Sequence, residues 1–563
     1  MEQTSRNESE PHLMSPEKVS PGAKPSPSAW GEGRREQAGK QSAPAQNSGG
    51  VRVDSASGSK VRISWESSGD GESNSQGRAQ AGSASKAGPV AGEVGVPRST
   101  VDLHYYKRCK EGRGDTYSTR RGEAKDTEMA QATEIVTSEK VRQLQIALYR
   151  KAKAQPKYRF WSLYGELLRL DVLGSALDAQ LRNGGGAGVD GESLASVESR
   201  RQAWLQQLRE ELKTKGYRPS PVLRVMIPKP SGGQRPLGIP TVKDRVVETA
   251  AYLVLMPIWE ADFHPQSYGF RPKRRAHQAI DGICQAVHQG YVEIIDADLS
   301  NYFGTIPHRA LMKMVARRVS DGSMLRLIKG WLQAPIVEQD KDGTKRVIPN
   351  RCGTPQGGVI SPLLANIYLS PLDQGVNEKC VGQARMFRYA DDFVIACRRG
   401  RASKVRERTK QWLEAKGLKL NEAKTRVVDI HQEGINFLGF NLTSRQSRKG
   451  TKYLHVEPSQ GSRTALRDNL RGILNHWTQW RPIEDVVKET NQVLRGWSGY
   501  FHFRNSTSVM DNLKRYSRNR LRRWLWRKHA CKGGLWSRYP DEQLHTHYGL
   551  YQLPTTAAWK AAR

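Results

Sequence analysis

The sequence contains few cysteines, no long apolar segment and too few acidic residues to balance its basic ones. Its 563 residues include six cysteines, which are scattered and form no Cys-x-x-Cys pair. That spacing argues against a zinc site and a disulfide framework, and it is typical of proteins in a reducing cytosol. No apolar run approaches the roughly 18 residues needed to span a bilayer, and the first residues lack the apolar core of a signal peptide. We therefore expect a soluble, intracellular protein.

The shortage of acidic residues leaves a large positive charge. Ninety Lys and Arg residues face 56 Asp and Glu residues, which gives a formal net charge of +34 and an isoelectric point near 10.0. Such an excess indicates a polyanionic partner, and nucleic acid is the first candidate. A membrane surface is the alternative, but no membrane-spanning segment supports it. The chain is also long enough for two or three domains.

Residues 1–130 differ in composition from the rest of the chain. They are rich in Ser, Gly, Pro, Gln and charged residues. A segment of this kind buries too little apolar surface to offset the entropy of ordering, so we expect a disordered, low-complexity extension. A basic tether for RNA is one interpretation. The simpler interpretation is a solvated tail, or an over-long start to the reading frame. Met129 is an alternative start.

Two segments carry acidic residues at the ends of expected strands. Apolar, β-favouring residues surround the adjacent Asp391 and Asp392, which predicts a β-hairpin with both acids near its tip. Residues 291–303 predict a buried strand followed by Asp296 and Asp298, whose side chains share a face because strands have a period of two. Adjacent carboxylates in an apolar frame are costly to bury ionised, and Mg²⁺ is the natural neutralising cation. An ordinary acidic turn is the alternative for either segment alone.

Glycine and basic residues mark two further segments. Residues 224–240 contain two short apolar runs separated by Pro-Ser-Gly-Gly-Gln, which predicts a second β-hairpin. Lys229 and Arg235 lie on either side of its turn, where both can reach one triphosphate. Residues 353–364 form a glycine-rich loop before a helix, and small residues there allow a base pair to approach the backbone closely. The glycine run at 184–188 lacks the Lys-Ser/Thr of a phosphate loop, so a flexible connector is expected.

The C-terminal part combines helical periodicity with tryptophan and arginine. Residues 462–503 carry apolar residues at helical spacing, which predicts a helical core. Seven of the 14 tryptophans follow residue 470. Interleaved aromatic and basic residues around Trp524 and Trp526 suit base stacking and phosphate contacts. A basic helix whose tryptophans pack inward is the alternative, and the two interpretations can hold together. The basic residues are Arg518, Arg520, Arg522, Arg523, Arg527 and Lys528.

Four of these segments follow one another in an order that resembles the reverse transcriptases encoded by group II introns. They are residues 227–229 with Arg235, 298–303, 353–358 and 389–392, and further similarities lie at 266–272, 420–425 and 437–440. The resemblance extends from about residue 140 to the C-terminus. It implies a right-hand polymerase with α+β fingers and palm over 131–445, a helical thumb or maturase domain over 446–510, and a basic nucleic-acid-binding segment over 511–563.

The resemblance also implies the catalytic carboxylates. Asp298, Asp391 and Asp392 would hold two Mg²⁺ ions, which in such sites lie about 3.5–4 Å apart and assist both the attacking and the leaving oxygen. Asp296 would be a supporting acid. Gly304 departs from the family pattern, because many relatives carry Asp there. It is not one of the three metal positions, so activity is expected to survive this difference.

The same resemblance assigns residues to the incoming nucleotide. Lys229 and Arg235 would hold its triphosphate, the arginine as a fork and the lysine as a point charge. Phe303 would exclude a ribose 2′-OH and so favour dNTPs, and Gln356 would line the nucleotide pocket. Lys424 is a candidate general acid, which either protonates the pyrophosphate or merely contacts it.

The implied activity is RNA-directed DNA synthesis that copies intron RNA during retrohoming, together with splicing assistance as a maturase. A free-standing reverse transcriptase in defence or repair is the alternative. Expected partners are intron RNA, template RNA, primer DNA and dNTPs, in a cytoplasmic bacterial ribonucleoprotein associated with DNA. Without the His-Asn-His residues and paired cysteines of an endonuclease, the chain resembles the endonuclease-less type, whose primer comes from a nick or a replication fork. The expected nucleic-acid contacts are Arg495, Trp497, Arg522, Arg523, Trp524, Trp526 and Arg527.

Overall fold

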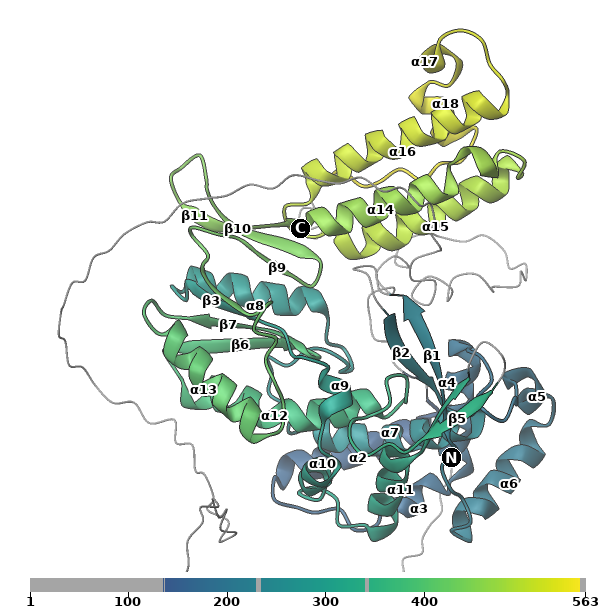
Figure 1. Cartoon of the computed structure of the whole chain (residues 1–563), viewed down its shortest axis with the longest axis vertical. Coiled ribbons are helices and arrows are strands. Elements are labelled where there is room, and N and C mark those ends of the chain that lie inside the picture. Colours follow the sequence, from purple (N-terminus) through teal and green to yellow (C-terminus); the bar gives the residue numbers. More distant parts are fainter. Residues whose placement is uncertain (1–134, 136, 229–233, 340–343, 557–563) are drawn as a thin grey trace, which may run out of the picture. The chain divides into compact units, whose positions relative to one another are not determined.

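The computed structural model describes residues 135, 137–228, 234–339 and 344–556 (Figure 1). Mixed helices and sheets come first and an all-helical part follows, which confirms the expected α+β fold with a helical C-terminal domain. The expected disordered extension, residues 1–130, lies outside the described residues. Within the described ranges, no helix combines the length and the apolar character that crossing a membrane requires.

The first helices assemble around α7 (Val242–Glu260), which is buried along nearly its whole length. Its partners include α2 and α4, whose apolar faces join the largest hydrophobic core. The glycine run at 184–188 connects α4 to α5, and there Arg245 Nη2 on α7 donates a hydrogen bond to Gly186 O at 2.9 Å. The helices before the first strand are α2 (Glu139–Ala154), α3 (Tyr164–Leu167), α4 (Leu170–Asn183), α5 (Leu194–Ser199) and α6 (Arg201–Lys213).

A four-stranded sheet in the order β2-β1-β4-β5 contains the hairpin predicted around residue 231. Its antiparallel strands β1 and β2 are in register from Leu223 with Ile239 to Pro228 with Gln234. β4 joins β1 in parallel and pairs with β5 in an antiparallel manner. The strands are β1 (Val222–Pro228), β2 (Gln234–Ile239), β4 (Ile336–Gln339) and β5 (Lys345–Ile348).

The second sheet, in the order β6-β7-β3-β8, is antiparallel throughout and is covered on both faces. Ile294 and Val394 face the core shared with α8, whereas Ile295 and Phe393 face the core shared with α12 and α13 (Figure 1). Alternating apolar side chains therefore bury both faces, as expected for a strand in the middle of a domain. The strands are β3 (Glu293–Ala297), β6 (Ala384–Tyr389), β7 (Asp392–Cys397) and β8 (Arg426–Asp429), and the helices are α8 (Ala276–His288), α9 (Tyr302–Thr305), α10 (His308–Val315), α11 (Gly322–Gln333), α12 (Ser361–Lys379) and α13 (Ala402–Ala415).

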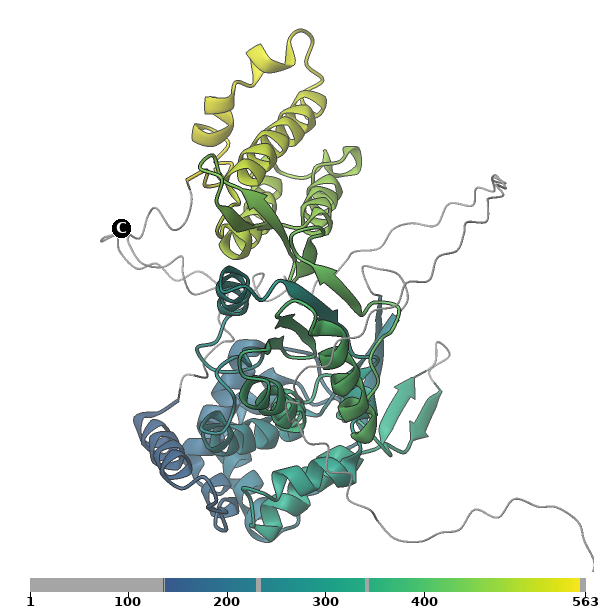
Figure 2. The same ribbon diagram turned by 90° about the vertical axis from the view of Figure 1, so that its left-hand side faces the viewer.

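A small antiparallel sheet, β11-β10-β9, precedes the helical domain. The helices therefore begin at α14, rather than at the expected boundary of residue 446. α16 crosses the expected boundary at 510, and the ribbon of Figure 2 shows it, in yellow, beside the other helices of this part of the chain. Its apolar side chains share one core with those of α14 and α15. The C-terminal segment is thus part of the helical domain. These elements are β9 (Ile435–Phe437), β10 (Phe440–Gln446), β11 (Lys452–Pro458), α14 (Gln460–Ile473), η2 (His476–Thr478), α15 (Ile483–Phe501), α16 (Thr507–Lys528), α17 (Leu535–Arg538) and α18 (Asp541–Thr546).

Candidate active site

The three expected catalytic acids lie at one end of the second sheet (β6-β7-β3-β8), which we call the central sheet. β3 ends at Ala297, whose register partner on β7 is Phe393. The following residue on β3 is Asp298 and the preceding residue on β7 is Asp392, so these two adjoin across the antiparallel pair. Asp391 lies in the turn between β6 and β7. Carboxylates separated by 391 − 298 = 93 residues of sequence therefore meet at the same end of the sheet.

The carboxylate of Asp298 is held by the segment that follows α13. Lys424 Nζ lies 3.1 Å from Asp298 Oδ2, and Asn421 Nδ2 donates to the same oxygen at 3.1 Å. The Asn421 amide also donates to the Asp298 carbonyl at 2.8 Å. Within the described part of the chain, no three acidic, histidine or cysteine side chains are grouped closely enough to hold one metal ion. Because Lys424 already pairs with Asp298, a cation shared by the three acids would compete with Lys424 for this carboxylate.

The environment of the acids favours a positively charged ligand. Solvent reaches Asp392, but the surrounding protein partly desolvates it, and this effect together with the charges of Asp391, Asp298 and Asp296 raises its pKa to about 6. Desolvation is the main cause that raises the pKa of Asp391, and the negative charge of Asp298 raises it further. Burial raises the pKa of Asp296 as well, although Arg426 Nε lies 3.4 Å from Asp296 Oδ2. Cation binding would relieve the repulsion among these carboxylates.

A fully buried arginine holds the hairpin that carries Asp391 and Asp392. Arg388, on β6, has none of its side chain exposed to solvent, and each of its five N–H groups has a partner. An arginine with all five donors satisfied fixes its partners in one geometry. The acceptors are Asp373 Oδ1 and Oδ2 (2.8 and 2.6 Å), Asn366 Oδ1 (2.8 Å), Ala390 O (2.8 Å) and Ser267 Oγ (2.7 Å).

The hairpin turn itself needs a glycine opposite it. Ala390 has a φ of +61°, in the left-handed region that non-glycine residues rarely adopt. Gly269 packs against this turn so closely that a Cβ atom there would lie 2.3 Å from Ala390 N. Two backbone hydrogen bonds, Tyr268 N to Arg388 O (2.8 Å) and Arg388 N to Gln266 O (3.0 Å), fix the contact. The segment 266–272 thus positions the two acids from outside the hairpin.

Two of the expected nucleotide-binding residues lie on β2 and α9. Arg235, on β2, is exposed, and its positive charge acts against the rise in the pKa of Asp391. Phe303, on α9, is partly exposed, and its ring meets that of Phe270 edge-on with centroids 6.4 Å apart. Lys229, by contrast, lies outside the described residues. The charge of Arg235 therefore acts on one of the three acids, and the Phe303 ring packs against the segment 266–272, which supports their hairpin.

The glycine-rich loop is tied to both of these elements. The amide of Thr354 donates to Phe303 O at 2.7 Å, and the amide of Gly238 on β2 donates to Gln356 O at 2.5 Å. Gly357 has a φ of +119°, and a Cβ atom there would lie 2.0 Å from Gly238 O. The loop can therefore adopt this path only with glycine at 357. Its hydrogen bonds hold Gln356 between β2 and the segment containing Phe303.

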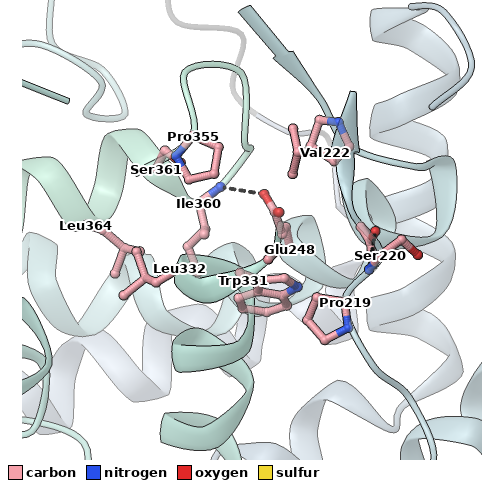
Figure 3. Close-up of a pocket in the computed structure, with 13 residues that line it drawn as sticks. Pro219, Ser220, Val222, Glu248, Trp331, Leu332, Pro355, Ile360, Ser361 and Leu364 are labelled. Atoms are coloured by element: carbon pink, nitrogen blue, oxygen red, sulfur yellow. Dashed lines mark hydrogen bonds between the residues drawn. The ribbon is translucent and has the colours of Figure 1, made fainter. Parts of the chain in front are cut away.

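A buried carboxyl group lies behind this loop, in a cavity of about 10 Å³ between the first sheet and α12 (Figure 3). A space of that size holds about one water molecule. The amide of Ile360 donates to Glu248 Oε2 at 3.2 Å. Burial raises the pKa of Glu248 to about 7, and the charge of Asp244 contributes in the same direction. Glu248 thus anchors the point where the glycine-rich loop becomes α12.

Several predicted nucleic-acid contacts are buried in the core of the helical domain. Trp497 is 4% exposed, Trp524 is 2% exposed and Arg522 is fully buried. Trp524 Nε1 donates to Thr478 Oγ1 at 3.0 Å, and Arg522 Nε donates to Tyr539 O at 2.7 Å. Their side chains face neighbouring helices, so these three are structural and are not direct contacts.

The remaining predicted contacts differ in accessibility. Arg495, Arg523 and Arg527 are exposed, and Trp526 is half-buried. The Arg495 guanidinium lies 4.6 Å from the centroid of the Tyr551 ring. The exposed arginines remain available to a polyanion, whereas Trp524 follows the inward-packing alternative and Trp526 follows it in part.

Sequence reasoning missed Arg388, Glu248 and two exposed tryptophans, Trp477 and Trp480, which are 76% and 81% exposed. A signal existed for Arg388, because it interrupts the apolar run that leads into the acidic turn. A charged residue at such a position needs a buried partner. Glu248 offered a similar signal within an otherwise apolar helix. For Trp477 and Trp480 the signal was weaker, since only the neighbouring Asn475 and Pro482 mark a turn.

Two family models match this chain, each over less than half of its length. The model described as "Reverse transcriptase (RNA-dependent DNA polymerase)" matches residues 227–442. The model described as "Group II intron, maturase-specific domain" matches residues 463–540. The first match includes the three acids, the glycine-rich loop and Arg235, and the second covers most of the helical domain.

Curated proteins are similar to this chain over different shares of their length. "Protein YkfC" of Escherichia coli K12 is 36% identical over 349 residues, which cover 55% of this chain and 90% of that protein. "Uncharacterized 91 kDa protein in cob intron" of Schizosaccharomyces pombe is 24% identical over 373 residues, covering 53% and 45%. "Group II intron-encoded protein LtrA" of Lactococcus lactis subsp. cremoris is 34% identical over 218 residues, covering 38% and 35%. The chain therefore spans less than half of the latter two proteins.

Proposed function

Because this chain belongs to the family of group II intron-encoded reverse transcriptases and maturases, we propose that Asp298, Asp391 and Asp392 are the catalytic carboxylates of its RNA-directed DNA polymerase. The observation that carries the assignment is the β3–β7 register, which sets Asp298 beside Asp392 with Asp391 in the adjoining turn. The positive charge of Arg235, on β2, acts on Asp391. Carboxylates opposite a guanidinium form a site that suits a cation and a triphosphate together.

The chemistry of the donors fits divalent magnesium, although the three carboxylates are not grouped closely enough in this structure to hold one ion together. Three carboxylates from two strand ends provide only oxygen ligands, and their mutual repulsion favours a cation. Bound Mg²⁺ would supply charge stabilisation at the attacking and leaving oxygens of nucleotidyl transfer. The chain's own contribution is to hold these carboxylates at fixed positions through Arg388 and Gly269. Lys424, which pairs with Asp298, would accompany the departing pyrophosphate as a contact or as a proton donor.

The nucleotide-binding residues divide between charge and shape. Arg235 would bind the triphosphate as a fork, joined by Lys229. Phe303 would occupy the space that a ribose 2′-OH requires, and Gln356 would line the pocket beneath the base pair. The hydrogen bonds from Thr354 to Phe303 and from Gly238 to Gln356 support this arrangement, because they tie both nucleotide-facing elements to one loop.

The partners we propose are intron RNA, an RNA template and a DNA primer. The reverse transcriptase would copy intron RNA during retrohoming, and the helical domain would assist splicing of the same RNA. The maturase-specific match to residues 463–540 favours this function over a free-standing enzyme in defence or repair. We also propose that the chain works in a cytoplasmic ribonucleoprotein associated with DNA. The net charge of +34 supports its nucleic-acid partners.

The test compares two aspartates on one strand. Asp298→Asn should abolish primer extension on an RNA template. Asp296→Asn, two residues earlier, should retain activity within about tenfold, because the carboxylate of Asp296 pairs with Arg426. Equal loss in both variants, at unchanged thermal stability, would contradict the assignment.

A splicing assay at low magnesium, with the RNA that flanks the gene as substrate, separates the maturase activity from the polymerase activity. Asp391→Ala/Asp392→Ala should support splicing as well as the wild type while lacking polymerase activity. If neither protein stimulates splicing and the wild type still extends primers, the maturase half of the proposal is wrong.

A further inference from the structure

The turn between α14 and α15 carries two tryptophans that face solvent. Trp477 and Trp480 are 76% and 81% exposed, and the His476 and Trp477 rings lie 4.2 Å apart. Burying an indole ring contributes strongly to stability. Two such rings exposed to water in one turn are therefore unusual for a folded domain. A binding partner that covers them would account for their exposure.

Hydrogen bonds within the turn and from α16 hold the turn in place. The amide of Thr478 donates to Asn475 Oδ1 at 3.1 Å, and Thr478 Oγ1 donates to Ile473 O at 2.8 Å. From α16, Trp524 Nε1 donates to Thr478 Oγ1 at 3.0 Å, and Lys528 Nζ donates to Gln479 O at 2.6 Å. The exposed rings therefore stand on a fixed base, which lowers the entropy cost of binding.

Arginines adjoin the turn on α16. Arg520, Arg523 and Arg527 recur every three or four residues and so share one face of the helix. The guanidinium of Arg520 donates to Leu474 O, at the start of the turn. Burial lowers the pKa of Arg520, and the positive charges of Arg471, Arg527 and Arg523 lower it further.

Few acids offset this positive cluster. Arg471 pairs with Asp468 at 2.6 Å, whereas within the described ranges Arg520, Arg523 and Arg527 form no ion pair. Like charges gathered without counter-charges cost free energy that a polyanion recovers on binding. The acids that follow the turn, Glu484 and Asp485, lie in the first turn of α15, where they complement the helix dipole.

We propose that Trp477 and Trp480, together with Arg520, Arg523 and Arg527, form a binding site for unpaired nucleotides of RNA. The indoles stack on bases, which expose both faces only when unpaired, and the arginines contact the flanking phosphates. The proposal rests on the proposed function in one respect: the maturase-specific match across this site makes RNA, rather than single-stranded DNA, the expected ligand.

Binding is measured with the full-length protein and a fluorescent oligoadenylate RNA of roughly 12 nucleotides, a length within the usual range of single-strand sites. Unlabelled RNA–DNA template–primer, present at saturation, occupies the polymerase cleft. Trp477→Ala/Trp480→Ala should weaken binding by at least about 30-fold, the lower end of what two lost base stacks cost. Trp161→Ala, which removes an indole that is 70% exposed outside the helical domain, is the matched control and should bind as the wild type does.

Two further variants separate stacking from charge. Trp477→Phe/Trp480→Phe should recover most of the affinity, whereas the corresponding leucine variant should resemble alanine, because leucine has bulk without an aromatic face. Arg523→Gln/Arg527→Gln should reduce the slope of log affinity against log salt by about 1.4, at about 0.7 for each lost phosphate contact to a single strand. The tryptophan variants should leave that slope unchanged.

The proposed site would be overturned if the double alanine variant bound RNA with wild-type affinity. It would also be overturned if the double leucine variant bound RNA as well as the double phenylalanine variant does. Equal weakening for a fully paired RNA of the same length would overturn the assignment to unpaired nucleotides, and stronger binding of oligodeoxyadenylate would overturn the choice of RNA. Primer extension is followed in the same preparations. Its absence in the wild type would refute the proposed polymerase function while leaving the binding comparison decisive for this site.

Discussion

Arg388→Met provides the sharpest test of how the active site is held in place. The substitution keeps the unbranched stem of the side chain but removes the guanidinium with its five hydrogen bonds, and it leaves the buried Asp373 carboxylate without its cation. Breaking a buried ion pair by removing one partner costs about 3–5 kcal/mol. At roughly 2 °C for each kcal/mol in a large domain, the melting temperature should fall by roughly 6–10 °C.

Activity should fall independently of stability. Without the bond from Arg388 to Ala390 O, the turn that carries Asp391 loses its only side-chain support among the hydrogen bonds of the described residues. A displacement of about 1 Å at reacting groups reduces turnover about 100-fold. Measured well below the melting temperature, kcat for primer extension should therefore drop by about that factor.

A second substitution separates the two effects. Asp373→Asn, added to Arg388→Met, replaces an unpaired charge by an unpaired neutral amide, which costs about 1–3 kcal/mol instead of about 3–5. Roughly 2 kcal/mol of stability should return, whereas kcat should not, since the bond to Ala390 is still missing. Arg399→Met is the control: Arg399 pairs with Asp429 at 3.0 Å but is 70% exposed, so its loss should be nearly neutral. If Arg388→Met retained full kcat despite the lower melting temperature, the positioning role would be wrong.

Three other substitutions test neighbouring parts of the site. Gly269→Ala should lower both thermal stability and polymerase activity, because its Cβ would lie 2.3 Å from Ala390 N; an unchanged melting curve would contradict this close contact. Glu248→Gln should be more stable than the wild type at high pH: the folded-state pKa of Glu248 is about 7 against 4.5 unfolded, so the wild type loses up to ~3 kcal/mol between those pH values. Melting temperatures recorded from pH 5 to pH 8 should diverge for the two proteins, and parallel curves would refute a raised pKa. Phe303→Ala should raise the incorporation of ribonucleotides relative to deoxyribonucleotides, and unchanged selectivity in single-nucleotide extension would remove Phe303 from the nucleotide pocket.

The hairpins and the buried strand could be predicted because their signals are local. Alternation of apolar residues, an acidic turn and a Pro-Ser-Gly-Gly-Gln loop are each readable within about ten residues. The antiparallel sheet that unites Asp298 with Asp392 has no such local signal. The resemblance to a family supplied that juxtaposition, and the register of β3 with β7 gives its geometry.

Partners distant in sequence explain what could not be predicted. Arg388 depends on Asn366, Asp373 and Ser267, and the last of these lies 121 residues away. The tryptophans show the same limit, since Trp524 and Trp477 both stand near basic residues in the sequence. Only the packing of α16 against α14 and α15 determines that the former is buried and the latter exposed.

The order of strands in the central sheet has a consequence for how the chain folds. β3 lies between β7 and β8, both of which follow it by about a hundred residues or more; Asp296, for example, contacts Arg426, 130 residues later. Sheets built from such distant pairings fold slowly, because loop closure precedes any gain from contact. During synthesis β3 leaves the ribosome long before either neighbour exists, with apolar side chains on both faces and both edges unpaired. β3, which directly precedes Asp298, therefore remains open to aggregation until residue 429 has been made.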